Sequence, residues 1–226
     1  MDDETLITNK KEKIWNFKEL NILSDKKKLP DTKVYQNTLI WKKQRAYYHA
    51  ELCEDIWTTL ITSSEKITLG GAKWNKAQIS TEANVESTAQ LLHSMADIMA
   101  QIINKVILKG KDEENISLGK VLVELQKHNN IKEIVTAIKK LKNSPEFEYI
   151  NAFVNTIKHR RLLDTTYYMV RNGSIPNMTK GICFQEFEYK GKKYEKMFAN
   201  DIIGQYKSRI IDLIIEIGNS INDYLR

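Results

Sequence analysis

The densest polar cluster with helical spacing lies between residues 155 and 161, in the segment Asn-Thr-Ile-Lys-His-Arg-Arg. In a helix, Asn155, Lys158 and His159 share one face, and Arg160 and Arg161 project sideways. An Asn and a His one turn apart can bind a base edge, a phosphate or a carboxylate on a facing helix. The arginines would add affinity for phosphate without sequence choice. Alternatively, Asn155 and His159 are partly buried and bonded to a neighbouring helix.

A second polar group interrupts the most regular apolar helix of the chain. His93 and Asp97 stand one turn apart, and Asn104 lies seven residues beyond Asp97 on the same side of the apolar stripe. An unpaired carboxylate in the core of a helical bundle is costly. We therefore expect Asp97 to contact His159 or Lys158 across the bundle. Such a contact either serves catalysis or only fixes the register of the helices.

A third group combines Arg45 and His49, again one turn apart. Here His49 could act as acid or base on a phosphodiester, and Arg45 could stabilise the developing charge. The acidic residues that come next, Glu51, Glu54 and Asp55, offer an alternative site for a divalent ion. Their spacing suits a metal poorly, so no metal site is predicted.

Motifs that define the common enzyme classes are absent from the sequence. It contains no Gly-rich phosphate loop before a helix, no HExxH, no EF-hand loop, no G-x-S-x-G and no Cys/His array with metal-ligand spacing. An ATPase, a Rossmann enzyme, a serine hydrolase or a structural zinc protein is therefore not expected, and no cofactor is predicted. Cys53 and Cys183 are interpreted as reduced, packed thiols.

The composition bounds the class of protein. The chain has 226 residues, 42% of them hydrophobic, with nine glycines, three prolines and a net charge of +6. Disordered, collagenous, disulfide-rich and extended all-β classes are disfavoured. The positive excess gathers at 132–142, 158–161 and 190–196. It permits contact with a polyanion, and it is equally typical of a solvated lysine-rich surface.

The N-terminus and the apolar segments indicate the compartment. The chain begins with acidic residues instead of the basic start of a signal peptide, and no segment approaches the roughly 18 uninterrupted apolar residues of a spanning helix. We therefore expect a cytoplasmic protein with no membrane contact.

Periodicity and capping residues predict a mainly α fold. Residues 1–33 form a weakly ordered or docked N-terminal segment, and residues 34–226 form a single helical-bundle domain. The bundle has four long and two short helices, with one β-hairpin inserted before the last helix. The expected helices cover 34–64, 80–110, 117–127, 131–142, 145 to about 172 and 199–225, and the hairpin covers 182–194.

The turn containing Asn155, Lys158, His159 and Arg160, together with the helix around 92–104, resembles uncharacterised bacterial all-helical proteins that are similar to the HEPN superfamily. The resemblance covers roughly residues 35–225. HEPN members include RNases of toxin and antiviral systems, so it implies RNA binding and a metal-independent RNase activity of a defence or toxin system. The HEPN catalytic pattern, an Arg followed after four to six residues by a His, is absent. Arg45 and His49 come closest.

These residues support two hypotheses. The first is a HEPN-like protein that binds RNA or nucleotide phosphate, with ribonuclease activity left open and two copies pairing through long helices. The alternative is a non-catalytic helical interaction protein, and solvent access at His159 separates the two. In the first hypothesis His159, Asn155, Lys158 and Asp97 are the candidate catalytic residues, and the candidate binding residues are Arg160, Arg161, Arg45, His49, His93 and Asn104.

Overall fold

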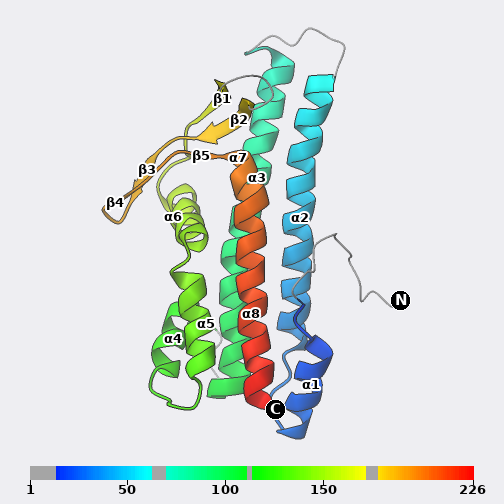
Figure 1. Ribbon diagram of the computed structural model, residues 1–226, viewed down its shortest axis with the longest axis vertical. Helices are drawn as coiled ribbons and strands as arrows, with labels where there is room; N and C mark the ends of the chain where they lie inside the picture. Colours follow the sequence, from blue (N-terminus) through cyan, green and yellow to red (C-terminus); the bar gives the residue numbers. More distant parts are fainter. Residues whose placement is uncertain (1–13, 63–69, 111–113, 172–177) are drawn as a thin grey trace.

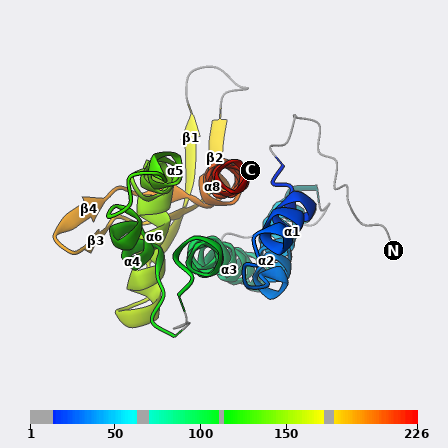
Figure 2. The same ribbon diagram turned by 90° about the horizontal axis from the view of Figure 1, so that it is seen from below.

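A computed structural model describes residues 14–62, 70–110, 114–171 and 178–226. The fold is mainly α, as predicted. Two long helices, α2 (Lys33–Thr62) and α3 (Ala72–Ile103), run side by side along the molecule, and α8 (Lys207–Leu225) packs beside α3 (Figure 1). Seen along the bundle, α3 lies between α2 and α6 (Figure 2). Helices α2, α3 and α6 carry most of the candidate residues.

Helix α3 is the central element of the core. Its buried face repeats at three and four residues, as the sequence indicates, and includes Val85, Leu92, Met99 and Ile103. The helix begins at Ala72, after Gly71, so the predicted start at Ser80 is wrong. By length and composition Ala72–Leu108 could cross a membrane, but the core helix of a soluble protein passes the same test, and half of its apolar window is buried inside the fold.

Three shorter helices come next in the chain. Serines cap two of them: Ser117 Oγ accepts from Lys120 N at the start of α4 (Leu118–Leu125), and Ser144 Oγ accepts from Phe147 N at the start of α6 (Pro145–His159), where the sequence predicts a cap. The helix between them, α5 (Lys132–Lys142), packs on α8. Pro145 occupies the first turn of α6, where a missing N–H breaks no hydrogen bond.

The prediction that α6 continues to about residue 172 is wrong. It ends at His159, and Thr165–Arg171 forms strand β1, antiparallel to β2 (Met178–Phe184). The two-residue strand β5 (Met197–Phe198) pairs with the other edge of β2. A run of β-branched and aromatic residues in β1 suits a strand. The chain therefore has a three-stranded sheet that was not predicted from the sequence.

The predicted hairpin is shorter than expected. It joins β3 (Phe187–Tyr189) to β4 (Lys192–Tyr194), because 182–184 belong to β2 instead. At the turn, Lys190 and Gly191 have φ of 53° and 76°. Positive φ at both central residues is the conformation that a two-residue hairpin turn requires, and Gly191 adopts it without strain.

The last helical segment is continuous, with a change of pitch. It comprises α7 (Ala199–Asp201), the π-helical turn η2 (Ile202–Tyr206) and α8. A similar π-helical turn, η1 (Asn104–Leu108), comes directly after α3. Such turns insert an extra residue into a helix and rotate the faces of the next turns about the helix axis.

Within the predicted N-terminal segment, Trp15 and the helix that follows it pack against α8, and residues 1–13 lie outside the described residues. Helix α1 (Phe17–Lys26) is preceded by the buried Trp15, whose indole lies over Gly218. A Cβ at position 218 would overlap the indole. Only glycine at this point of α8 therefore lets the N-terminal segment dock.

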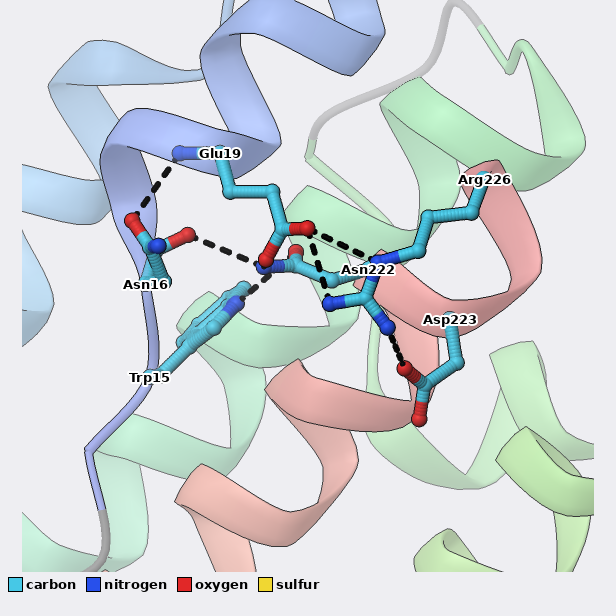
Figure 3. A network of polar contacts seen from close by, with 6 residues as sticks. All are labelled: Trp15, Asn16, Glu19, Asn222, Asp223 and Arg226. Carbon is cyan, nitrogen blue, oxygen red and sulfur yellow. Dashed lines mark hydrogen bonds and ion pairs between the residues drawn. The ribbon is translucent and has the colours of Figure 1, made fainter.

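A network of polar contacts fixes the docked segment (Figure 3). Trp15 Nε1 donates to Asn222 Oδ1 at 3.2 Å, and Asn222 Nδ2 donates to Asn16 O at 2.9 Å and Glu19 Oε2 at 3.2 Å. Arg226 Nε donates to Glu19 Oε1 at 2.8 Å. We call this group, completed by the Asp223 carboxylate bound to Arg226, the terminal network.

Candidate functional site

Two helices, α2 and α6, bring polar side chains to opposite sides of α3. From α2, Lys42 Nζ donates to Ser94 Oγ of α3 at 2.9 Å. From the other neighbour, α6, Asn151 Oδ1 lies 3.0 Å from His93 Nε2. The polar residues of α3 therefore connect α2 with α6, in the order seen in Figure 2.

Lys42 is the electrostatic centre of this arrangement. Burial lowers the pKa of Lys42 from its ordinary 10.5, and the nearby charges of Arg45 and Lys158 lower it further. Among the described residues, Asp97 acts in the opposite direction. Arg45 of α2 and Lys158 of α6 thus act on Lys42, and the carboxylate of Asp97 on α3 opposes them. We call Lys42, Arg45 and Lys158 the cationic cluster.

Beside the cluster, three side chains are bonded to one another. Asn155 Nδ2 donates to Asn151 O at 2.7 Å and to Asn151 Oδ1 at 3.2 Å, and that same oxygen lies next to His93. The ring of His93 is parallel to that of Phe147, with centroids 6.3 Å apart. Asn155 and His93 are therefore held in place, and Asn155 uses its amide N–H groups within its own helix.

His159 stands apart from these residues. It is the last residue of α6 and is exposed. Within the described residues, no hydrogen bond or ion pair joins Asp97 to His159 or to Lys158. The half-buried Asp97 instead influences Lys42. The expected contact across the bundle is thus replaced by a longer-range effect on a lysine of α2.

The two arginines after α6 interact locally. The guanidinium of Arg160 lies 5.2 Å from the centroid of the Tyr189 ring in β3, a distance suited to a cation–π interaction. Arg161 lies 3.9 Å from Asp164 in an exposed ion pair. Arg160 thus connects the end of α6 to the hairpin, and both side chains remain on the surface.

Arg45 and His49 of α2 lie in different environments. His49 Nδ1 lies 2.7 Å from Asn84 Oδ1 of α3, and Arg45 is exposed. The two side chains still share the flank of α2 that carries Lys42, at spacings of three and four residues. His49 is therefore fixed at the edge of the cationic cluster.

Asn104 lies elsewhere. It is buried in η1, its backbone oxygen accepts from Gly110 N at 3.0 Å, and its side chain fills the space that a Cβ at Gly110 would occupy. Its Nδ2 has no hydrogen-bond partner among the described residues. Asp97 is only half-buried, and no hydrogen bond joins it to Asn104 among the residues that the structure describes.

The acidic residues of α2 face a different cation. Lys207, at the start of α8, is buried with its Nζ 4.2 Å from the centroid of the Tyr47 ring. Burial lowers the pKa of Lys207, and Glu54 and Glu51 raise it. In the part of the chain that the structure describes, no group of three or more His, Cys, Asp or Glu side chains is placed to hold a metal ion.

A surface cavity of about 370 Å³ lies away from all of these residues. It is lined by the loop before α5 and by the end of α8, including Asn130, Ile134 and Tyr224. None of the candidate residues borders it, so the cationic cluster is a surface site and not part of this cavity.

Sequence reasoning missed two residues at the centre of the site, Lys42 and Asn151. Lys42 could have been found from its position three residues before Arg45 and seven before His49 on one helix flank. Asn151 precedes Asn155 by one turn. Of their partners on α3, His93 was recognised from its spacing to Asp97, whereas Ser94 carries no local sequence signal.

No protein-family model matches the chain, and neither a curated protein nor a solved structure matches it.

Proposed function

We propose that the protein binds RNA or nucleotide phosphate through the cationic cluster, as a HEPN-like helical protein. The observation that carries the proposal is the position of half-buried Lys42, which donates to Ser94 Oγ at 2.9 Å and lies under the influence of the exposed cations Arg45 and Lys158. Structural lysines are usually paired or solvated. A lysine held among like charges is a candidate for binding an anion.

The chemistry of the cluster suits phosphate. Three like charges near one another raise the free energy of the unliganded site, and a phosphate group would offset this repulsion while accepting hydrogen bonds from each cation. Ser94 holds Lys42 in position through a 2.9 Å hydrogen bond. Lys158 and Arg45 are exposed and can reach a ligand at the surface.

The proposal extends to binding and not to strand cleavage. General acid and base catalysis of RNA cleavage needs titratable groups that converge on one phosphodiester. His159 is separated from Asn155 and Asp97 in its contacts, and His49 and His93 are engaged by Asn84 and Asn151. The resemblance to HEPN proteins supports RNA as the source of the phosphate.

One observation favours the alternative, a non-catalytic interaction protein. Asn151 joins His93 and Asn155 in a set of mutual contacts that needs no ligand. Under this alternative the three residues only connect α3 to α6, and the cations are solvated. The two functions differ in whether charge at the cluster controls RNA affinity.

The test measures binding of a labelled single-stranded RNA oligonucleotide at several salt concentrations. We expect the combined variant Lys42→Gln, Arg45→Gln and Lys158→Gln to bind more weakly and to reduce the slope of log affinity against log salt by about 2, because three phosphate contacts are lost. The matched control is Lys132→Gln with Lys139→Gln, two exposed cations on α5.

Equal loss in the control variant, or wild-type binding that is insensitive to salt, contradicts the proposal. His159→Ala is compared in the same binding assay and in an RNA cleavage assay. We expect unchanged binding, because no described contact joins His159 to the cluster. If the wild-type protein cleaves RNA and His159→Ala does not, the protein is a ribonuclease and the restriction of the proposal to binding is wrong.

A further inference from the structure

Two exposed aromatic side chains of α2 lie beside the cationic cluster. Trp41 and Tyr48 have exposed fractions of 62% and 57%. Seven residues are close to two helical turns, so the two rings lie on one face of α2, about 10 Å apart along the helix axis. Arg45 is exposed on the same face, one turn after Trp41 and three residues before Tyr48. The two rings therefore adjoin the cluster through Arg45.

The ring of Tyr48 is held by a residue at the edge of the cluster. Its centroid lies 5.6 Å from that of the His49 ring, at an interplanar angle of 64°. His49 Nδ1 in turn lies 2.7 Å from Asn84 Oδ1 of α3. A ring that is already positioned loses little conformational entropy when a ligand covers it. Tyr48 is thus prepared to contact a flat ligand.

The charges along α2 indicate an anionic ligand for this face. Lys42, Lys43 and Arg45 stand between the two rings in the sequence. Beyond Tyr48 the helix carries the exposed Glu51, which repels an anion, so the favourable part of the face ends at Tyr48. Cations interleaved with exposed aromatic rings are typical of proteins that bind single strands, in which the cations contact the phosphates and the rings stack on the bases.

We infer, on the basis of the proposed phosphate site, that Trp41 and Tyr48 stack on bases of single-stranded RNA whose phosphates lie on the cationic cluster. In a duplex the base faces are covered by neighbouring bases, so only unpaired bases can stack on the rings. The rings are about 10 Å apart along α2, more than the roughly 3.4 Å between stacked bases of one strand. The bound strand is therefore unstacked at this point, and a mononucleotide cannot contact both rings.

The first test measures binding of a labelled oligouridylate at several salt concentrations. We expect Trp41→Ala to weaken binding about tenfold, because one base loses its stacking partner, and Trp41→Phe to keep most of the affinity. The slope of log affinity against log salt stays unchanged, because no phosphate contact is lost. The matched control is Val123→Ala on α4, where the residue is 61% exposed and lies outside the site. Circular dichroism confirms that the variants are folded.

The second test changes the nucleic acid. An abasic oligomer of the same length keeps the phosphates and lacks the bases. We expect the wild-type protein to bind it as weakly as the double variant Trp41→Ala with Tyr48→Ala binds the oligouridylate. A duplex RNA contacts the cluster through its phosphates alone, so the double variant should bind the duplex as the wild-type protein does.

Failure of phosphate binding and failure of base stacking give different results. Wild-type binding that is insensitive to salt contradicts the proposed function and the stacking together. Salt-sensitive binding that Trp41→Ala leaves unchanged overturns the stacking alone, as does an abasic oligomer that binds as tightly as the oligouridylate. Equal losses for duplex and single strand show that the rings do not select unpaired bases. A changed molecular mass of Trp41→Ala, with RNA affinity retained, assigns the rings to contact between copies of the protein.

Discussion

The terminal network and the cationic cluster are both polar groups where helices meet, but they differ in charge balance. In the terminal network, the Trp15 and Asn222 donors each find an acceptor, and Arg226 finds two carboxylates (Figure 3). In the cationic cluster, Lys42 lies under the influence of two cations and one carboxylate. A completed network stabilises the fold, whereas an incomplete one leaves room for a ligand.

The comparison predicts opposite effects of substitution in the two regions. Removing a member of the terminal network leaves partners unsatisfied and destabilises the protein. Removing a cation from the cluster relieves repulsion and weakens ligand binding.

The largest effect is expected for Gly218→Ala. The new methyl group overlaps the Trp15 indole, so the N-terminal segment must undock or shift, and the free energy of unfolding falls by about 3 kcal/mol. Denaturant unfolding, monitored by tryptophan fluorescence, measures the loss. Gly204→Ala is the control, because a Cβ there meets nothing within 4 Å. Equal losses in the two variants would contradict the packing argument.

Asn222→Ala is expected to cost about 2 kcal/mol, because the buried Trp15 N–H loses its acceptor and Asn16 O loses one of its two donors. The same unfolding experiment measures it. The neighbouring Asp223→Ala removes an exposed carboxylate and should change stability little. If Asp223→Ala loses more unfolding free energy than Asn222→Ala, the buried amide of Asn222 is not the centre of the network.

Lys42→Gln, in contrast, should stabilise the protein slightly. The pKa of Lys42 is lowered in the folded protein, so at neutral pH its charge opposes folding, and the variant is expected to unfold at a slightly higher temperature. Between the lowered pKa and 10.5 the unfolded chain binds more protons, so wild-type stability rises with pH and the advantage of the variant shrinks.

Thermal unfolding at neutral and alkaline pH, together with the salt-dependent RNA titration, tests this prediction. Ser94→Ala serves as a control, because it removes the hydrogen bond to Lys42 and keeps the charge. A destabilised Lys42→Gln variant with unchanged RNA affinity would place Lys42 among ordinary structural residues.

The smallest effect is expected for Arg226→Gln at the rim of the terminal network. Arg226 is exposed, and its contacts with Glu19 and Asp223 are open to solvent and salt. We expect a small decrease in the unfolding temperature that disappears at high ionic strength. A large decrease that persists at high salt would mean that the exposed contacts of Arg226 stabilise the protein as much as the buried amide of Asn222 does.

Part of the fold could be predicted because it depends on local interactions. The start of α6 is an example, because Ser144 Oγ accepts from a backbone N–H three residues away and Pro145 follows in the first turn. The predicted continuation of α6 beyond His159 is wrong for a physical reason. The apolar spacing of the helix continues past its end, but residues 165–171 are rich in β-branched and aromatic types that favour a strand. Strand β1 forms by pairing with β2, and this pairing depends on a segment that comes later in the chain.

The candidate site was less predictable. Arg45, His49, Lys158 and Asn155 were recognised from their spacing, but their partners were not. Lys42 meets Ser94, and His93 meets Asn151, 52 and 58 residues away in the sequence. Which polar groups approach each other depends on how α2 and α6 pack against α3, and no local pattern records this.

The sequence by itself determined a mainly helical chain, the start of α6 at Pro145 and a basic balance, because each of these depends on residue type and short spacing. Only the tertiary structure decided that Trp15 rests on Gly218, that Lys42 is held among cations, and that Trp41 and Tyr48 of α2 are exposed. These outcomes depend on contacts between distant segments, whose geometry is set by packing of the whole core.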